Sequence, residues 1–231
     1  MEKLIYLTWS REGLGAEEYA EHLLEEVAPA LLGAGARALN LGLTDVRETL
    51  ADHPLVMGEG ATLSAAVSLW LDCLDQRAPL EEALAAQARR MDGYLVTESV
   101  PQPFPGRDWP DGARCPGVTH FTWFPKPEGL SDEAFYHGWH EVHTPHSFEL
   151  HPLRCEYVRN AVARAITPGA PTVHAIVAER FPRLEDYTNP GRLYGSKEAL
   201  QRTIEDLPLY ADMATMHATP LSEVIVKSLG V

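Results

Sequence analysis

A run of histidines between Phe135 and Pro152 is the feature of this chain most able to do chemistry. It holds half of the ten histidines in the sequence, namely His137, His140, His143, His146 and His151. Because the unperturbed pKa of histidine lies near neutrality, such a cluster indicates proton transfer or metal ligation. The repeated spacing of three residues, followed by Pro145, predicts a helix over 131–144 with Ser131 as its N-terminal cap.

Helical geometry places these histidines on different faces. At about 100° per residue, Phe135, Trp139 and Val142 form a buried apolar stripe. His143 lies at the edge of this stripe, where a pKa can be tuned for acid or base catalysis. The alternative is that His143 only stabilises the last helical turn through the helix dipole.

The remaining members of the run do not converge on one point. His137 is predicted to face solvent, and His140 lies between the two faces. Steps of three residues move round the helix, so at most two neighbouring imidazoles can meet, even with Glu141 beside them. The His-Glu-x-x-His pattern of zinc sites does not occur in the sequence. We therefore predict no metal site.

The chain repeats its own pattern, and the histidine helix belongs to the second copy. Residues 7–29 and 121–145 share a Thr-Trp pair, a polar turn, a Gly-Leu pair, an aromatic residue and a closing proline. The matched positions are Thr8-Trp9 with Thr122-Trp123, Gly13-Leu14 with Gly129-Leu130, Tyr19 with Phe135, and Pro29 with Pro145.

The two copies differ where chemistry is expected. In this register Trp139 and His143 correspond to Leu23 and Val27 of the first copy. The first copy thus carries an apolar helix where the second carries aromatic and imidazole groups. We expect the first half to be scaffold, and one functional pocket per chain to form mainly from the second half.

Each copy has the element order β-α-β-β-α-β of a ferredoxin-like unit. Such a unit covers one face of its sheet with helices, so two copies can bury the other face by pairing. Strands are expected over about 4–9, 37–46, 63–72, 94–100, 118–124, 154–163, 173–180 and 221–227, and helices from about 16, over 80–90, over 131–144 and within 182–215.

Several positions of the second half fall in a register that is typical of a known family. They are Gly129-Leu130-Ser131, Phe135, Trp139, His143, Pro145, Tyr157, Asn160, Ala211-Asp212 and Glu223. On these residues, 117–228 resembles an EthD-type domain of the dimeric α/β barrel superfamily, whereas the first half is similar only in outline. The resemblance implies a barrel of two ferredoxin-like halves with a ligand pocket. It also implies a link to xenobiotic breakdown, or to dehydration or cyclisation of polyketide-like aromatics.

The predicted fold class is therefore α+β, with two tandem ferredoxin-like (βαββαβ) repeats in a dimeric α/β barrel-type architecture. Repeat 1 is expected over 1–100 and an EthD-type repeat 2 over 117–231. The proline- and glycine-rich residues 101–116 are expected to form a loop linker.

Further candidates lie outside the histidine run. Tyr157 lies on a predicted strand and could donate a proton or hydrogen bond to a carbonyl oxygen, or be a core tyrosine. His120 and His174 alternate with apolar neighbours and are expected to point into the barrel interior. Asp212 and His217 flank the last strand, where an Asp-His pair could orient an imidazole, although Asp212 could equally be a solvated helix residue.

Residues 188–200 combine turn chemistry with a helix start at Ser196. They could form the rim of a pocket, with Arg192 and Tyr194 facing a ligand. An ordinary turn at Pro190-Gly191 is the alternative.

Composition narrows the class of partner. The 231 residues carry a formal charge of −14, which disfavours nucleic acid, and no apolar run is long enough to span a bilayer. The three cysteines form no Cys-x-x-Cys pair, which disfavours a disulfide framework and a thiolate zinc site. The N-terminus does not resemble a secretory signal, so we expect a cytoplasmic protein.

These features favour a cofactor-independent lyase, dehydratase or isomerase acting on a small, apolar, oxygenated substrate, aromatic or polyketide-like. Nucleotide-binding and serine-hydrolase motifs do not occur in the sequence, and we predict no cofactor. A non-catalytic binding or accessory protein and a cofactor-free oxygenase remain open, and we expect a homodimer. The predicted catalytic residues are His143, Tyr157 and His140, and the predicted substrate-binding residues are Trp139, His120, His174, Asn160, Asp212 and His217.

Overall fold

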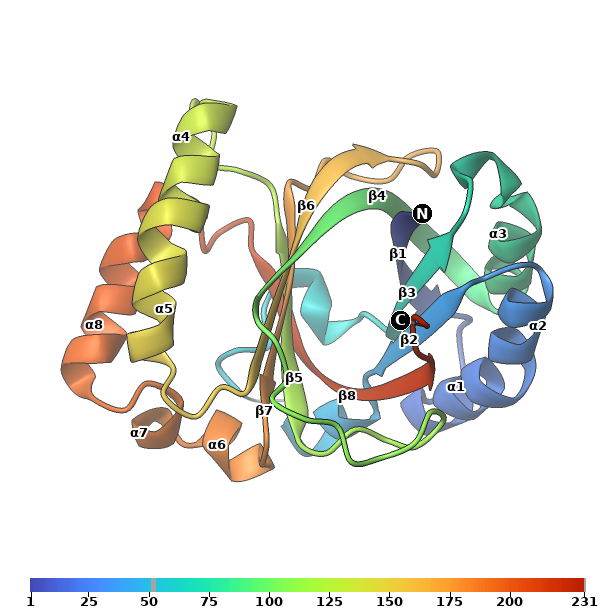
Figure 1. Cartoon of the computed structure of the whole chain (residues 1–231), viewed down its shortest axis with the longest axis horizontal. Coiled ribbons are helices and arrows are strands. Elements are labelled where there is room, and N and C mark those ends of the chain that lie inside the picture. The colour runs from blue at the N-terminus through green and yellow to red at the C-terminus, as the bar shows by residue number, and fades with distance from the viewer. Residues whose placement is uncertain (51–52, 231) are drawn as a thin grey trace.

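A closed barrel of eight antiparallel strands forms the centre of the computed structural model, which describes residues 1–50 and 53–230 (Figure 1). The strands follow the order β1-β3-β2-β8-β5-β7-β6-β4 around the barrel. Their bounds are β1 Glu2–Ser10, β2 Ala38–Leu43, β3 Ala65–Leu71, β4 Ala88–Gln102, β5 Val118–Phe124, β6 Glu156–Ala165, β7 Ala175–Phe181 and β8 His217–Lys227. The chain is thus an α+β protein, as predicted.

One chain closes this barrel by itself. The first four strands lie together as β4-β1-β3-β2 and the last four as β8-β5-β7-β6, and the pairs β2–β8 and β4–β6 join them. Among the described strands none lies at a sheet edge, so pairing of exposed strand edges does not argue for a dimer. The homodimer stays a prediction.

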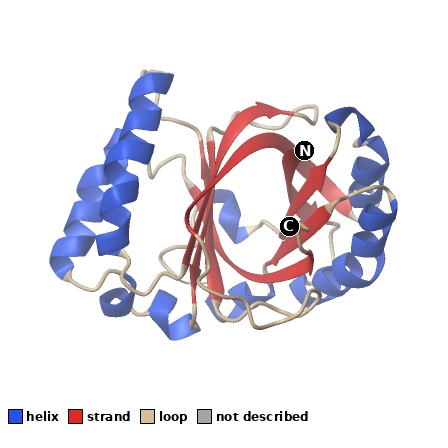
Figure 2. Cartoon of the chain, in the orientation of Figure 1, coloured by secondary structure: helices blue, strands red, loops and turns tan. Residues whose placement is uncertain are grey.

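Helices cover the two opposite flanks of the barrel (Figure 2). On one flank lie α1 (Ala16–His22), a π-helical segment (Leu23–Val27), α2 (Ala28–Gly33) and α3 (Ala78–Ala85). On the other lie α4 (Asp132–Tyr136), a π-helical segment (His137–His143), α5 (Thr144–Leu150), α6 (Leu184–Thr188), α7 (Pro190–Leu193) and α8 (Lys197–Asp206). Short 3₁₀ segments cover Asp45–Leu50, Gly58–Ala61, Leu74–Gln76 and Leu207–Leu209.

The prediction that the histidine helix ends before Pro145 was wrong. The helix widens into a π turn over His137–His143 and continues through α5 to Leu150, with Pro145 in the first turn of α5. The backbone N–H of Thr144 bonds to the carbonyl of Trp139, five residues back, and its hydroxyl donates to the same oxygen at 2.8 Å. Because the π turn is wider, the proline ring is accommodated without ending the helix.

Other element boundaries also differ from the predicted ones, because contacts between distant segments override the local sequence pattern. Residues 88–90, predicted to be helical, begin β4, because Arg90 pairs in register with Trp9 and binds Glu59 and Asp92. The predicted loop linker is in part hydrogen-bonded to β8, since the N–H groups of Gly112 and Cys115 donate to its carbonyls at 2.8 Å. The predicted helix start at Ser196 is confirmed, because its hydroxyl accepts a bond from Ala199 N at 3.0 Å.

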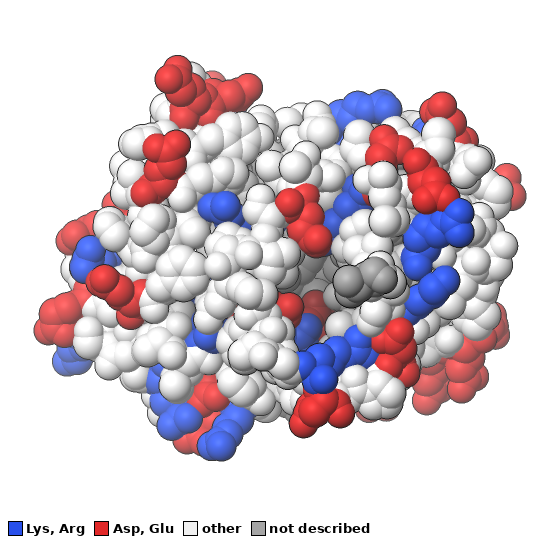
Figure 3. Space-filling model, viewed as in Figure 1, with Lys and Arg blue, Asp and Glu red and all other residues white. Residues whose placement is uncertain are grey.

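Alternation along the strands separates the barrel interior from the helix-covered outer face. In β5, Thr119 and Phe121 line the interior, whereas His120 and Thr122 lie beneath the helices. The end of the barrel is visible as a hollow in the surface, and charged side chains of both signs lie in it (Figure 3).

No helix within residues 1–50 and 53–230 combines the length and the apolarity that crossing a bilayer requires.

Candidate active site

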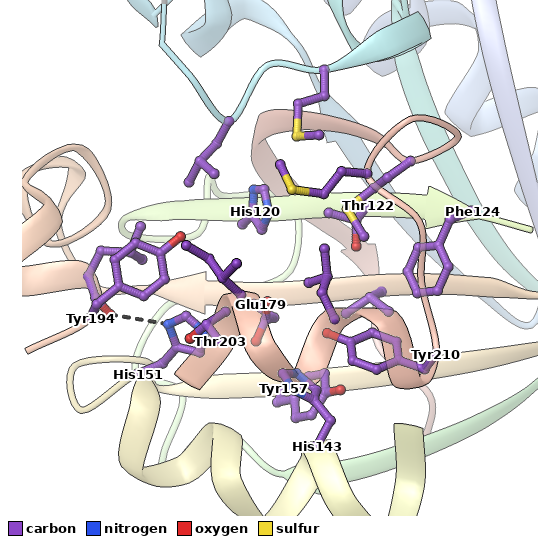
Figure 4. A pocket seen from close by; sticks show the side chains of 18 of the residues that line it. His120, Thr122, Phe124, His143, His151, Tyr157, Glu179, Tyr194, Thr203 and Tyr210 are labelled. Atoms are coloured by element: carbon purple, nitrogen blue, oxygen red, sulfur yellow. Dashed lines mark hydrogen bonds between the residues drawn. The ribbon is translucent and has the colours of Figure 1, made fainter. Parts of the chain in front are cut away.

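A cavity of about 140 Å³ lies between the outer face of β5, β6 and β7 and the helices of the second half (Figure 4). Its walls are mostly apolar, with a few polar groups set among aromatic and aliphatic side chains, which is typical of small-molecule sites. The polar lining residues are His120, Thr122, His143, His151, Tyr157, Glu179, Tyr194, Thr203 and Tyr210. The apolar ones are Leu55, Met57, Phe124, Trp139, Val177, Phe181, Leu193, Leu200, Ile204, Leu207, Met213 and Met216.

The floor of the cavity is a polar row across three neighbouring strands. His120 of β5 is the register partner of Glu179 in β7, and Glu179 is the register partner of Tyr157 in β6. Residues opposite each other in an antiparallel sheet point to the same face, so the three side chains lie next to one another beneath the helices.

Glu179 is an anion held inside this apolar space. Its Oε1 forms an ion pair with Nη1 of Arg154, whose side chain is fully buried. Arg154 also donates to Gln102 Oε1 at 2.9 Å and to Ser147 Oγ at 3.0 Å. Burial alone would raise the pKa of Glu179, but Arg154, His151 and His120 lower that pKa to about 2.

Two imidazoles flank the carboxylate and are neutral near pH 7. Burial lowers the pKa of His120 to about 4, and its Nδ1 lies 3.1 Å from the hydroxyl of Tyr187. Burial also lowers the pKa of His151, whose Nδ1 donates to the carbonyl of Leu193 at 3.1 Å. In its neutral form His151 therefore carries its proton on Nδ1 and leaves Nε2 as an acceptor.

His143 enters the cavity from the π turn. It is 7% exposed, and its ring packs against the ring of Tyr210 with 4.6 Å between centroids. Burial lowers its pKa to about 4. Within the described residues its Nδ1 has no hydrogen-bond partner, and the nearest carboxylate, Asp206, lies 3.8 Å away while accepting from His146 at 3.0 Å.

Tyr157 lies at the centre of the polar floor. Trp139 Nε1 donates to its hydroxyl oxygen at 3.2 Å, and the Arg154 guanidinium lies 4.3 Å from its ring centroid. Burial raises its pKa to about 12, so the phenol stays protonated and can donate to a ligand. Burial also keeps the pKa of Tyr210 well above its usual value.

The structure brings together four of the residues predicted to be catalytic or substrate-binding: His143, Tyr157, Trp139 and His120. The predicted direction of His120 was wrong. It points to the helices and not into the barrel, because the bulky Phe121 and Trp123 take the interior face of β5. Tyr194 also lines the cavity, whereas Arg192 binds Asp186 outside it.

Three other predicted residues lie away from the cavity. His140 packs between Trp139 and Tyr136, with ring centroids 4.6 and 5.3 Å away. Burial lowers the pKa of His140 to about 4. His174 accepts a bond from the backbone of Lys126 at 3.1 Å, and Asn160 points to the barrel interior on the opposite face of β6.

The proposed Asp-His pair at the last strand does not form. Asp212 is exposed and accepts from Ala214 N at 2.9 Å within a turn. His217 accepts from Glu59 N at 3.1 Å and packs on Trp123 in the core. Each side chain therefore has a local structural partner.

Sequence reasoning missed Glu179, His151 and Tyr210. Glu179 had a usable signal, because it shares a strand face with the apolar Ala175, Val177 and Phe181, where an isolated charge is unexpected. His151 has no such signal, because it reaches the cavity only through α5, which lies beyond the predicted helix end. Among the described residues, His, Cys, Asp and Glu side chains do not group in threes in a way that could hold a metal ion.

No family model matches the chain, and no curated protein matches it, so the EthD resemblance is not confirmed. Solved structures do match. An anthrone oxidase-like protein is 10% identical with a TM-score of 0.60, over 100% of this chain and 94% of that one. A candidate monooxygenase from Lactobacillus acidophilus NCFM is 11% identical with a TM-score of 0.50, over 98% and 96%.

A candidate monooxygenase from Fusobacterium nucleatum subsp. nucleatum ATCC 25586 is also similar, at 10% identity and a TM-score of 0.51, over 98% of this chain and 92% of that one. At such identities the likeness concerns the fold alone, which here is a closed antiparallel barrel flanked by helices.

Proposed function

We propose that this protein is a cofactor-independent oxygenase that takes a proton from a small, apolar, oxygenated aromatic substrate bound beneath the helices. The observation that carries the proposal is His143, a buried neutral imidazole with an unpartnered Nδ1 among the described residues, in the wall of an apolar cavity. A cavity of about 150 Å³ admits benzene, so about 140 Å³ accommodates one aromatic ring.

His143 would act as the general base. Its pKa near 4 keeps it in the base form at neutral pH. When it takes a proton, the imidazolium gains Asp206 at 3.8 Å as a counter-charge, and the substrate anion formed beside it raises its pKa further.

Tyr157 would bind the substrate oxygen. Its oxygen already accepts from Trp139 Nε1, and the Thr144 hydroxyl also lies within hydrogen-bonding reach, so on substrate binding its own O–H would turn to donate to a carbonyl or phenolate. A hydrogen bond that strengthens as negative charge develops on the substrate stabilises the transition state. Glu179 disfavours anionic ligands in the ground state, because it is a buried anion in the same floor.

The step balances with O₂ as co-substrate. A substrate R₂CH₂ gives its proton to His143, and the electron pair left on carbon forms a C–O bond with O₂. The His143 imidazolium then returns the proton to the peroxide anion, which gives the hydroperoxide R₂CHOOH and the neutral base. The hydroperoxide then loses water to give R₂C=O, so that R₂CH₂ and O₂ yield R₂C=O and H₂O. The likeness to an anthrone oxidase-like protein and two candidate monooxygenases supports this reaction class.

A lyase or dehydratase is the second candidate and shares the first step. It is favoured by the second neutral imidazole, His120, on the far side of Glu179 from Tyr157, because elimination also needs a group that handles the proton of a leaving hydroxyl.

A substrate with one aromatic ring and a CH₂ activated by a neighbouring carbonyl, 2-indanone, provides the test together with dissolved O₂. We expect one O₂ consumed for each ketone formed, and a loss of about 10²-fold or more in turnover in His143→Gln. His137→Gln is the matched control, because His137 is exposed on the same helix. Full turnover in His143→Gln would contradict the base role, product formed without O₂ would favour the lyase, and binding without product would favour a carrier protein.

We further propose that the two halves are tandem ferredoxin-like repeats, at 1–100 and 117–231 and joined by 101–116. The same strand order in both halves supports this, as does a π-helical segment that ends two residues before a proline in each, Pro29 and Pro145. The homodimer and the cytoplasmic location remain expectations.

A further inference from the structure

A second cavity, of about 220 Å³, lies inside the barrel. It is separated from the candidate active site by the sheet itself, because neighbouring residues of one strand line the two spaces. Glu156 lines the interior and Tyr157 the active site, and the same holds for Arg180 and Glu179. The hollow at the end of the barrel in Figure 3 lies over this interior.

The charges around this interior cavity do not balance. Among its described lining residues, three are acidic (Glu98, Glu156 and Glu223) and two are basic (Lys3 and Arg180). Lys3 pairs with Glu98, while Arg180 is shared between Glu156, at 2.8 Å, and Glu223. One carboxylate is therefore in excess. The side chains of Glu98, Glu156 and Glu223 are 28%, 24% and 10% exposed, and a charge that is partly removed from water is stabilised by a partner.

Two residues that line the same space carry an unpartnered polar atom. Asn160 is 2% exposed, and within the described part of the chain its Oδ1 has no hydrogen-bond partner. Its orientation follows from Nδ2, which donates to the carbonyl of Ile176 at 3.1 Å. Asn40 likewise donates through Nδ2, to Glu223 at 3.4 Å, and in the described structure its Oδ1 has no partner. Both unpartnered atoms are hydrogen-bond acceptors, so a ligand with N–H donors would complement them.

The rest of the wall is apolar and aromatic. Trp70 and Phe121 line the cavity together with Val158 and Leu221. The ammonium of Lys3 lies 4.8 Å from the centroid of the Trp70 ring, so this ring already faces a cation. A ligand with a charged amine and an apolar body would meet both kinds of wall.

We propose that the barrel interior binds a small organic cation, a primary amine carrying one apolar or aromatic group. The ammonium balances the excess carboxylate beside Arg180 and donates to Asn160 Oδ1, and the apolar group packs on the aromatic wall. The site is independent of the proposed oxygenase reaction, since it lies on the other face of the sheet. The competing way to remove the excess charge is a proton on Glu156, the carboxyl whose pKa is raised by burial.

Isothermal titration of the whole chain at neutral pH with benzylamine tests the proposal. Benzyl alcohol and benzoate are the neutral and anionic controls of similar size. We expect saturable binding of benzylamine, and binding of benzyl alcohol and benzoate that is weaker by about tenfold or more. Equal binding of the alcohol, or no binding of benzylamine, would overturn the proposal, the second result pointing to a proton on Glu156.

Two variants locate the bound amine. Glu156→Gln removes the excess charge and should weaken benzylamine binding by about tenfold or more, whereas Glu149→Gln, an exposed carboxylate on α5, should leave it unchanged. Ala178→Leu fills the cavity from β7 and should abolish binding in a protein whose thermal unfolding still shows a folded chain. Undiminished binding in both Glu156→Gln and Ala178→Leu would place the amine elsewhere and refute the site.

Discussion

His120 and Glu179 are direct register partners across β5 and β7, on the sheet face that the second set of helices covers. A neutral imidazole and a carboxylate held anionic by Arg154 therefore lie next to each other in an apolar cavity. This arrangement sets the electrostatic character of the site, since it favours neutral ligands and stabilises a cation formed on a neighbouring imidazole.

Breaking the ion pair between Glu179 and Arg154 should lower the free energy of unfolding strongly. Glu179→Gln leaves the fully buried Arg154 side chain without its counter-charge, and we expect a loss of about 3–5 kcal/mol in the free energy of unfolding. Urea titration measures it. The double variant Glu179→Leu with Arg154→Met should recover most of the loss, because an apolar pair leaves no buried charge. A single variant as stable as the wild type would show that the pair contributes little.

The protein should lose stability as the pH is lowered below 6.5, because two buried histidines resist protonation in the folded chain. The pKa of His120 and of His143 is about 4 in the folded chain and 6.5 as the ordinary value. Between pH 6.5 and about 4 the unfolded chain therefore binds protons that the folded chain does not, and stability decreases as pH falls. Each histidine contributes up to about 1.4 kcal/mol per pH unit in this window.

Urea unfolding of the wild type and of His120→Gln at several pH values tests this. The slope of stability against pH should be smaller in the variant by about one histidine's share. An identical slope would mean that folding does not keep His120 neutral.

Glu179 affects stability at lower pH. Its pKa is about 2 in the folded chain and 4.5 as the ordinary value, so its contribution to the free energy of unfolding is lost as pH falls from 4.5 toward 2.

The strands could be predicted from the sequence and the π turn could not. Alternation placed a strand over 173–180, and β7 runs over Ala175–Phe181. The π turn depends on contacts between distant segments, such as Gly138 against Leu209, which helical periodicity does not contain. A helix that ends at Thr144 does not carry His151 to the cavity, so the sequence does not predict its place there. The sequence does predict that of His143, because it lies at the edge of the apolar stripe under either helix geometry.

The hydroxyl of Thr144 should hold the π turn in place. It donates to the Trp139 carbonyl and accepts from Arg159 Nη1, both at 2.8 Å, in a buried position. Thr144→Val should lower the free energy of unfolding by about 1–3 kcal/mol, because both partners lose a bond. Thr188→Val is the matched control, since within the described residues its hydroxyl bonds only to the carbonyl of Leu184, near the surface. Equal unfolding midpoints for the two variants would show that the π turn does not need this hydroxyl.

Gly138 should set how closely the histidine helix approaches Leu209 and Tyr210, the second of which lines the cavity. A Cβ at this position would lie 2.4 Å from the backbone oxygen of Leu209, just before Tyr210, so Gly138→Ala must push these segments apart. We expect a loss of about 1–3 kcal/mol in stability, measured by urea unfolding, and weaker binding of an aromatic ligand, because the ring of Tyr210 moves from His143. Gly33→Ala is the control, since a Cβ there meets no atom within 4 Å and alanine suits the helix end. If Gly138→Ala is as stable as Gly33→Ala and binds the aromatic ligand as tightly, the close approach is not needed for the shape of the cavity.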